Sequence, residues 1–419
     1  MKIARKFVGA AIGGAFGLGC VGAWAGGVGL GTQSGSGTGN AFAGGAAAAE
    51  DASTVWYNPA GMAVLPKGAN LSLALHFIKP SFKFSNVAST GAYATPGTGE
   101  GGDGGDWAAI PQGYFAMGVG QNLSLGIGVN TPYGLKTDYD AGWRGQLTAL
   151  KSDLKTYNIN PAVAYRINNW VSAGAGLSYQ RIEAELTNFA GAAGGATLKV
   201  KDGSWGWNLG ALFQPVDSVR IGVAYRSAIG HKLEGDAKFT VGIAGNGNIV
   251  ADVKMPASAS LSASGALNPE WDLMGDITWT RWSDFKRLNV VRTSGPLTGG
   301  LLTFLPFNWR DTTRYSIGAN YKPNSTWKIR FGAALDQTPT NDVDRTARLP
   351  DQDRTWLAFG AQYKVSKAGT VDFGYAHEFI KDATVNNLVP GFTTCAAGCL
   401  NGKFSNKADI ISIQYSHLF

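Results

Sequence analysis

The sequence contains few of the residues on which catalysis, metal binding and nucleic-acid binding depend. Only 16% of its 419 residues are charged, 4 are histidine and 3 are cysteine. No histidine stands in a serine or aspartate constellation suited to nucleophilic catalysis, and lysine and arginine form no cluster. The composition therefore argues against an enzyme and against a nucleic-acid-binding protein. It predicts no catalytic residue, no metal site and no cofactor.

Long apolar runs are also scarce. After residue 25 the chain has no run of about eighteen apolar residues, so any membrane crossing must use strands. Early basic residues, an apolar stretch at 7–21 and Ala23-Trp24-Ala25 predict a Sec signal peptide over residues 1–25. Cys20 also allows a lipoprotein signal, but Gly17 stands where such a signal has leucine. Cleavage after residue 25 leaves 394 residues, with 33 basic and 29 acidic side chains.

Two cysteines, Cys395 and Cys399, remain after the predicted cleavage. They lie in the loop from Thr393 to Gly402, and no histidine is near them. A signal peptide directs the chain to an oxidising envelope compartment. The spacing therefore predicts a small disulfide rather than a metal site.

From Gly68 onward, apolar residues alternate with small or polar ones. Residues 71–77 show the pattern, with Leu, Leu, Leu and Phe separated by Ser, Ala and His, and it recurs at 123–130, 219–226 and 315–321. A soluble β-sandwich has the same period, but a strand that faces lipid on one side and a lumen on the other also requires it. The 59 Gly, 13 Trp and 14 Tyr suit a large β structure with many turns and interfacial aromatics.

The connections between these segments alternate in length. Six are short, at residues 120–122, 167–169, 214–217, 268–270, 322–325 and 365–370, and seven are long, at about 78–106, 132–153, 187–197, 230–250, 283–310, 337–352 and 381–403. Outer-membrane barrels have short turns at one end and long loops at the other, whereas a sandwich does not sort its loops. We therefore predict an all-β fold, a 14-stranded antiparallel transmembrane β-barrel over residues 67–419. The segment 230–250 is open to a further hairpin.

Residues 26–66 do not follow the strand pattern. Their first half is rich in Gly, Ser and Ala, has no helical or strand period, and could not fold alone. Small residues let a backbone run close to walls that satisfy its polar groups, so we expect this segment to be a hatch inside the lumen. Asn58, Pro59 and Ala60 are the expected hatch anchor, because Pro59 fixes its own φ and Asn58 can bond nearby backbone. An ordinary turn before the first strand is the alternative.

The end of the sequence agrees with a barrel. Alternate residues from Ile411 to Phe419 are apolar, aromatic or histidine and share one face. This ending resembles the C-terminal signature of proteins inserted by the bacterial barrel-assembly machinery. We therefore expect the bacterial outer membrane as the location. The expected partners are that machinery, outer-membrane lipid and lipopolysaccharide, and no nucleic acid.

Several motifs resemble those of the long-chain fatty acid transporter family of outer-membrane barrels, which includes toluene and xylene uptake porins. They are the Gly-rich N-terminus that continues into Asp51-Ala52-Ser53 and Asn58-Pro59-Ala60, then 160–166, Pro269-Glu270-Trp271, 276–282, and 336–354 with Pro350-Asp351-Gln352-Asp353-Arg354. The resemblance covers the whole chain after residue 25. It implies fourteen strands and passive uptake of hydrophobic molecules. In that family these are caught among the outer loops, held above the hatch and released sideways into the bilayer.

The resemblance also implies a gap in the wall at a deformed third strand. Here that strand corresponds to residues 123–130, and the candidate gap residues are Gly126, Gly128 and the following Pro132. Glycine in a strand marks bends, and proline removes a donor from the ladder, so this strand can be distorted. The alternative is that the two glycines make room for the hatch.

Ligand capture is expected in the apolar stretch 299–309, which we place in a loop outside the bilayer band. The candidate capture residues are Phe304, Leu305, Phe307 and Trp309. Exposed apolar patches commonly mark contact sites, although such a loop can also pack over the barrel mouth. The charged residues of the next stretch predict an ion-pair network that folds their own loop rather than a substrate clamp; they are Arg345, Arg348, Asp351, Asp353 and Arg354. The sequence does not show which cation would hold a fatty acid carboxylate.

The sequence therefore predicts passive uptake of hydrophobic compounds, either long-chain fatty acids or related hydrocarbons, across the outer membrane. A porin for monoaromatic hydrocarbons is the alternative, because carriers of both kinds share these motifs. A general hydrophilic porin fits less well, since a hatch fills the lumen that such a porin leaves open.

Overall fold

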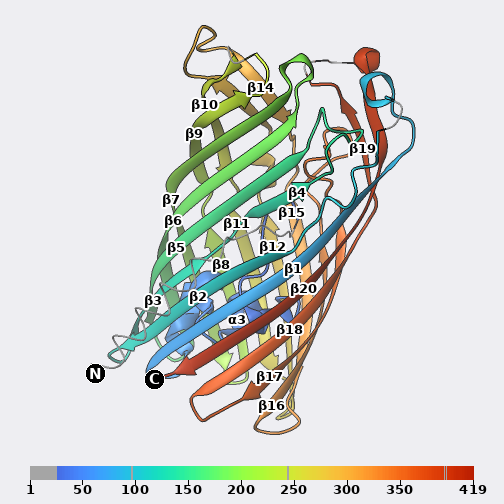
Figure 1. Ribbon diagram of the computed structural model, residues 1–419. Helices are drawn as coiled ribbons and strands as arrows, with labels where there is room; N and C mark the ends of the chain where they lie inside the picture. Colours follow the sequence, from blue (N-terminus) through green and yellow to red (C-terminus); the bar gives the residue numbers. More distant parts are fainter. Residues whose placement is uncertain (1–25, 96–97, 243–244, 391, 393) are drawn as a thin grey trace.

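The computed structural model describes residues 26–95, 98–242, 245–390, 392 and 394–419. The predicted signal peptide, residues 1–25, lies outside the described residues. Long strands, inclined to a common axis, surround a lumen, and residues 26–66 lie within it (Figure 1). No helix in the described ranges is long and apolar enough to cross a membrane.

Short helices occur mainly before the first strand. In the N-terminal segment, residues 26–66, they are α2 (Gly35–Thr38), α3 (Gly45–Ala48), α4 (Thr54–Tyr57) and the 3-10 helix η1 (Pro59–Val64). Single 3-10 turns in the connections are η2 (Gly91–Tyr93), η3 (Gly191–Ala193), η5 (Trp282–Asp284) and η6 (Cys395–Ala397). The strands are β1 (Ala69–Asn86), β2 (Ala108–Val119), β3 (Leu123–Asn130), β4 (Gly134–Asp138), β5 (Lys151–Arg166), β6 (Val171–Phe189), β7 (Gly195–Val216), β8 (Val219–Arg226), β9 (Ile229–Phe239), β10 (Gly247–Met255), β11 (Ser258–Ala266), β12 (Trp271–Thr280), β13 (Arg287–Arg292), β14 (Leu301–Pro306), β15 (Thr312–Tyr321), β16 (Trp327–Asp336), β17 (Arg354–Lys364), β18 (Gly369–Ile380), β19 (Ala383–Leu388) and β20 (Cys399–Leu418).

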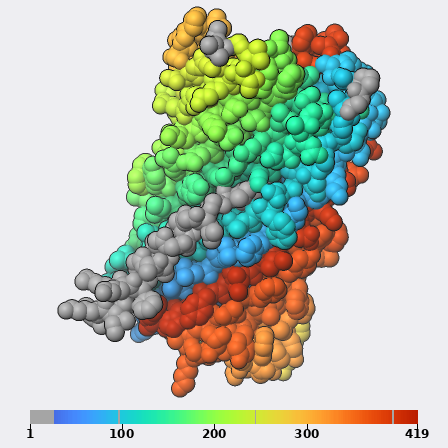
Figure 2. Space-filling view, viewed as in Figure 1, coloured from blue at the N-terminus to red at the C-terminus, as the bar shows by residue number. Residues whose placement is uncertain are grey.

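The strands of the described residues close into a ring of 14 antiparallel positions. Six positions hold two strands end to end: β3 with β4, β8 with β9, β10 with β11, β12 with β13, β14 with β15, and β18 with β19. β1 closes the ring by pairing with both β2 and β20. Figure 2 shows this seam as a blue band beside a red one. The predicted 14-stranded barrel is confirmed.

The period-two alternation of the sequence becomes an alternation of inward and outward side chains. Across β11, β12 and β15, Ser262, Asp276 and Ser316 are aligned by the strand register and are buried. Their neighbours on the opposite face, such as Leu261 and Ile277, are 51% and 46% exposed. Apolar side chains on the outside and polar ones inside are what a barrel in lipid requires.

The two ends of the barrel differ as the sequence predicts. All six predicted short connections are turns between consecutive strands, for example between β2 and β3 and between β17 and β18. Phe419 lies at this end, where its backbone N–H donates to the carbonyl oxygen of Ala69. Short turns face the periplasm in outer-membrane barrels.

The opposite end contains more strand than the sequence predicts. The expected loops at 187–197, 283–310 and 381–403 were wrong in this respect, because β6 with β7, β13 with β14, and β19 with β20 pair within them. Beyond the bilayer a strand needs no apolar outer face, so its sequence loses the alternation that marks the other strands. The open question about 230–250 is resolved as the β9 and β10 hairpin.

The N-terminal segment approaches the barrel wall backbone to backbone. Its short helices lie against the inner faces of β8, β11, β18 and β20, nearer the end with short turns (Figure 1). Wall glycines permit this approach: a Cβ added at Gly222 would lie only 1.9 Å from the carbonyl oxygen of Ala46. The segment also turns at Ala49, whose φ of 44° lies in the left-handed region. Small residues on both surfaces thus place this segment inside the ring.

Candidate functional site

An apolar cavity of about 90 Å³ lies inside the barrel toward the end with the long connections. Side chains from β4 to β7, β9, β10, β13 and β14 line it, together with the loop between β16 and β17. Val28 of the N-terminal segment also contributes to the lining. The lining is aliphatic or aromatic apart from Ser152, Thr346 and Arg348. Such a cavity suits a ligand that is apolar over most of its length.

Aromatic side chains form part of the wall of this cavity. Phe285 and Trp309 are stacked with their ring centroids 4.8 Å apart, and Phe307 contacts both rings at 5.2 and 5.1 Å. Trp282 packs edge-on against Trp309 at 5.1 Å. Three of the four expected capture residues, Leu305, Phe307 and Trp309, therefore lie at the cavity. Their role in capture stays a prediction.

Phe304 lies apart from the other three. It lies in β14 on the face opposite Leu305, is 38% exposed, and does not line the cavity. Its ring lies 3.8 Å from the guanidinium carbon of Arg287. The sequence places all four residues in an outer loop, but the structure places Phe304 and Leu305 in a strand. The expected loop was wrong because β14 pairs with β13 at this point.

Asn58 joins the end of the N-terminal segment to the barrel wall. Its amide nitrogen donates to the carbonyl oxygens of Ala46, at 2.7 Å, and of Ala211 in β7, at 2.9 Å. Its Oδ1 accepts a hydrogen bond of 3.0 Å from the backbone N–H of Ala60. Pro59 begins η1, where a missing N–H leaves no bond unmade. The geometry suits the anchor predicted for these three residues, and that role stays a prediction.

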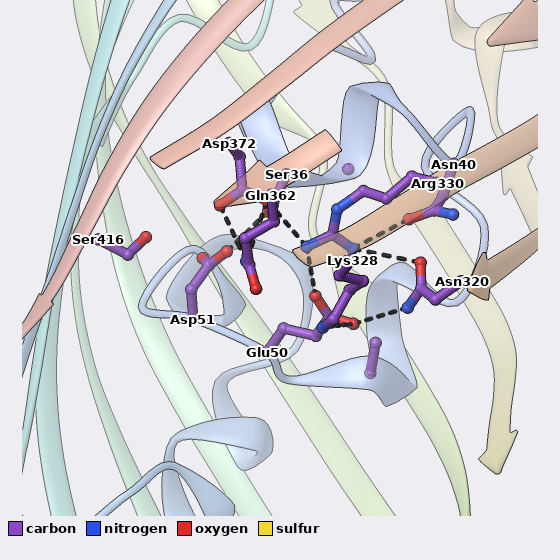
Figure 3. Close-up of polar contacts among 12 residues, drawn as sticks. Ser36, Asn40, Glu50, Asp51, Asn320, Lys328, Arg330, Gln362, Asp372 and Ser416 are labelled. Carbon is purple, nitrogen blue, oxygen red and sulfur yellow. Dashed lines mark hydrogen bonds and ion pairs between the residues drawn. The ribbon is translucent and has the colours of Figure 1, made fainter. Parts of the chain in front are cut away.

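Arg330 of β16 is the centre of a polar network between the wall and the N-terminal segment (Figure 3). Its Nη2 lies 2.8 Å from Glu50 Oε2 and 2.9 Å from Asp372 Oδ1, and its Nη1 donates to Asn40 Oδ1 at 3.2 Å. Lys328 lies 3.2 Å from the second oxygen of Glu50. Partial burial raises the pKa of Glu50. The charges and hydrogen bonds of Arg330 and Lys328 outweigh burial and hold that pKa well below its usual range.

The wall is interrupted beside Pro132, between β3 and β4. Pairing of β2 with β3 ends at Gly113 and Val129, and in the described ranges β4 pairs with no strand other than β5. Residues 108–112 of β2 therefore have no strand partner on this side within those ranges. Of the three expected gap residues, only Pro132 lies at the interruption. Its role as a lateral gap stays a prediction.

Gly126 and Gly128 lie before this interruption. Both are in a stretch of β3 that pairs with β2 on one side and with β5 on the other. A Cβ at Gly126 would lie 2.4 Å from the sulfur of Met62 and 2.8 Å from Val55. The contacts fit the alternative interpretation, in which these glycines make room for the N-terminal segment.

Residues 28–33 fill the interruption. Leu30 donates its backbone N–H to the carbonyl oxygen of Pro132 at 2.8 Å, and Gly134 donates its N–H to the carbonyl oxygen of Val28 at 2.9 Å. Between them, Gly29 forms an antiparallel bridge with Tyr133. Nε2 of Gln112 donates to the carbonyl oxygen of Thr32. Val28 takes part both in this contact and in the lining of the apolar cavity. The segment that fills the interruption therefore also borders the cavity.

The end with long connections also carries a disulfide. Cys395 and Cys399 are joined, with their Cα atoms 5.1 Å apart. Thr90, in the connection between β1 and β2, donates its backbone N–H to the carbonyl oxygen of Cys399 at 2.9 Å. The disulfide loop is thereby tied to a neighbouring connection. In the described part of the chain, no three His, Cys, Asp or Glu side chains are arranged to hold a metal ion.

Comparisons with known proteins identify the family. A family model described as "Outer membrane protein transport protein (OMPP1/FadL/TodX)" matches residues 18–419. The chain belongs to this family. An outer-membrane protein of Neisseria meningitidis is 31% identical, over 89% of this chain and 91% of that protein. A long-chain fatty acid transport protein of Escherichia coli is 26% identical, over 85% and 87%.

Members of this family are transport proteins of the outer membrane, as the sequence predicts for this chain. A solved FadL homologue from Pseudomonas aeruginosa has the same fold, with a TM-score of 0.86 and 24% identity. The superposition covers 94% of this chain and 100% of that one. The predicted family and location are confirmed.

Two features of the site are missing from the sequence interpretation. The ion pairs of Arg330 could have been inferred from the sequence, because the basic residues Lys328 and Arg330 alternate with the apolar residues Ile329 and Phe331. Charges on a lumen face require partners, and Glu50 lies in the segment expected to fill the lumen. The second feature, the fit of residues 28–33 into the wall, had no such signal because most of its contacts are made by backbone atoms.

Proposed function

We propose that this protein takes up hydrophobic compounds, such as long-chain fatty acids or related hydrocarbons, by passive diffusion across the outer membrane. The compound enters the apolar cavity from the end with long connections. Residues 26–66 act as a hatch that closes the axial route, and the compound leaves sideways through the wall beside Pro132. One observation carries the proposal: Val28 lines the cavity and also contacts the interrupted wall.

The energetics of an apolar ligand favour the sideways route. Exposure of one buried CH₂ group to water costs about 0.8 kcal/mol, so returning a chain of a dozen such groups to water costs about 10 kcal/mol. A path from the cavity to the bilayer avoids most of that cost. The axial path leads instead to a second cavity of about 200 Å³, which polar side chains such as Arg226, Asp276 and Asp336 help to line.

Uptake of monoaromatic hydrocarbons is the second candidate. The stacked rings of Phe285 and Trp309 offer a flat apolar wall on which an aromatic ligand can pack. General diffusion of hydrophilic solutes is disfavoured, because the N-terminal segment occupies the lumen on the periplasmic side and is bonded to it through Asn58 and Glu50. Catalysis forms no part of the proposal, since the described relatives are named for transport or for the outer membrane.

We also propose which partners the barrel contacts in the membrane and during its insertion. Its half-exposed outer residues, such as Leu261 and Ile277, suit contact with outer-membrane lipid and lipopolysaccharide. Insertion by the barrel-assembly machinery is supported by the alternation of apolar or aromatic with polar residues in the last strand, β20. Cross-linking in growing cells would test both contacts.

Binding to the purified protein tests the choice of ligand. Straight-chain compounds of increasing length should bind with rising affinity until the apolar cavity is filled, because each further CH₂ adds buried area. Toluene and xylene should bind more weakly than the longer chains. Tighter binding of the monoaromatic compounds would favour the second candidate. Failure of every hydrophobic compound to bind or to be taken up would overturn the proposal.

A further inference from the structure

One buried arginine of this site has no counter-charge in the part of the chain that the structure describes. Four arginines in the described ranges are almost completely buried, with exposures from 2% to 8%. Three of them form ion pairs: Arg330 with Glu50 and Asp372, Arg354 with Asp351 and Glu378, and Arg345 with Asp342. Arg348 forms no ion pair with any residue that the structure describes. The expected ion-pair network of this loop therefore does not include Arg348.

The partners of Arg348 are few and neutral. Its Nη1 donates to the carbonyl oxygen of Lys151 and to Ser152 Oγ, each at 3.2 Å, and its Nη2 donates to Asn188 Oδ1 at 3.3 Å. Its Nε is buried and has no acceptor among the described residues. These bonds lie at the long end of the usual range, whereas a carboxylate binds a guanidinium at about 2.7–2.9 Å. Burial lowers the pKa of Arg348 to about 10, which leaves it charged at neutral pH.

The missing counter-charge of Arg348 matters because of where this side chain lies. Arg348 lines the apolar cavity, and its contact with Ser152 concentrates polar lining at one place. Elsewhere the lining is aliphatic or aromatic, apart from Thr346 in the same loop. An unpaired buried charge is costly unless something supplies the opposite charge. A neutral hydrocarbon in this cavity would leave that cost in place, whereas a ligand with an anionic end would remove it.

We propose that Arg348 binds the terminal carboxylate of the transported compound while the apolar lining holds its hydrocarbon tail. The ligand is therefore a singly charged amphiphile, such as a fatty acid, rather than a neutral hydrocarbon. Ser152 Oγ lies close enough to Arg348 to donate to the same carboxylate. This inference rests on the proposed function and narrows its ligand class.

The test compares a fatty acid with the fatty alcohol of the same chain length, at a pH where the acid is ionised. The unmodified protein should bind the acid about tenfold to a hundredfold more tightly, the range expected for hydrogen bonds to a charged group. Arg348→Met should lose this preference while its affinity for the alcohol stays within about twofold. Arg348→Lys should keep part of the preference, because it retains the charge without the planar fork.

Arg345→Met is the matched control. Arg345 is a buried arginine of the same loop, bonded to Asp342 and to the carbonyl oxygens of Asp351 and Thr384, but it does not line the cavity. Its loss should disturb the loop and leave the preference for the acid intact. If it removes the preference as fully as Arg348→Met does, the loop and not Arg348 is responsible, and the inference fails.

The remaining outcomes separate this inference from the proposed function. Equal binding of acid and alcohol by the unmodified protein, or an undiminished preference in Arg348→Met, would overturn the role of Arg348. The proposed uptake would stand, because the alcohol still binds. If the unmodified protein binds neither compound, the proposed function fails together with the inference.

Discussion

Nη2 of Arg330 and Oε2 of Glu50 lie 2.8 Å apart, and this ion pair ties the barrel wall to the N-terminal segment. Arg330 is 2% exposed in its side chain, and Glu50 is 25% exposed. Asn320 of β15 donates to the other oxygen of Glu50 at 3.0 Å, and Asp372 of β18 binds the same guanidinium. One carboxylate of the N-terminal segment is thus fixed to several neighbouring strands.

Replacing Glu50 should loosen the hatch. Glu50→Gln removes the charge that faces Arg330 and Lys328, and a hydrogen bond to a charged group contributes about 1.5–3 kcal/mol. We expect a higher or more frequently fluctuating single-channel conductance in planar bilayers at neutral pH. Asp342→Asn is the control, because Asp342 is paired with Arg345 but is 72% exposed and lies outside this network. Unchanged conductance in Glu50→Gln would show that the pair does not hold the segment.

Acid should reproduce the effect of that substitution. The pKa of Glu50 is lowered in the folded protein, so its ion pairs contribute fully above the ordinary value and are lost as the pH falls through the lowered one. The single-channel conductance of the unmodified protein should therefore stay constant from neutral pH to about pH 4. It should rise only in stronger acid, where Glu50 is protonated. Glu50→Gln should lack this acid step. A step of the same size in that variant would assign it to another group.

Asn58→Ala should loosen the hatch at its other end. The change removes bonds to Ala46, Ala211 and Ala60, each of which contributes about 0.5–1.5 kcal/mol. We expect brief conducting openings while the barrel remains folded. Asn168→Ala is the control, since Asn168 also bonds backbone groups, accepting from the N–H groups of Trp170 and Val171, but lies in a periplasmic turn. Equal conductance in both variants would argue against an anchor at Asn58.

The two faces of β14 should differ in their effect on ligand binding. Leu305→Ala combined with Phe307→Ala removes apolar lining of the cavity and should weaken binding by about 2 kcal/mol or more, roughly thirtyfold. Phe304→Ala should change binding little, because Phe304 does not line the cavity. Equilibrium binding with the purified variants measures both effects. A larger loss in Phe304→Ala would return capture to the outer surface.

Because Cys395 and Cys399 form a disulfide, we predict no free thiol after residue 25. Cys395 and Cys399 are joined, so a membrane-impermeant thiol reagent should label neither in intact cells without reductant. After reduction Cys395 should react, since it is exposed at the end with long connections. Strong labelling of both sulfurs before reduction would contradict the pairing. Cys399→Ser provides the control, because it should make the exposed Cys395 reactive from the start.

The barrel could be predicted from the sequence because lipid and lumen impose opposite demands on alternate residues. Leu261 and Ser262, on opposite faces of β11, illustrate these demands. The outer parts of β9 and β10 could not be predicted in the same way. They stand beyond the expected bilayer band, where both faces tolerate polar residues.

The candidate site was only partly predictable. The stretch 345–354 shows several charges, but the sequence does not show that Arg354 pairs with Glu378, 24 positions away, while Arg348 has no acid beside it among the described residues. Which cation is left unpaired depends on how the strands bring distant residues together. Gly126 and Gly128 drew attention to β3, but the interruption itself depends on strand pairing around Pro132.

A reversible cross-link can hold residues 28–33 in the interrupted wall. Gly29 and Tyr133 are partners in an antiparallel bridge, and residues so paired lie within the Cα separation that a disulfide needs. A Cβ at Gly29 would meet Trp282 at 3.5 Å, which is ordinary contact. The variant Gly29→Cys with Tyr133→Cys should therefore form the cross-link. Cys395→Ser and Cys399→Ser in the same chain prevent exchange with the native pair.

Uptake of a labelled long-chain fatty acid by this cross-linked variant, measured before and after reduction, tests the sideways route most directly. The account predicts that the oxidised protein binds the ligand but takes up almost none, and that reduction restores uptake in the same sample. Each single cysteine variant should transport equally under both conditions. Equal uptake by the oxidised and reduced double variant, with the cross-link shown to be complete, would contradict an exit beside Pro132.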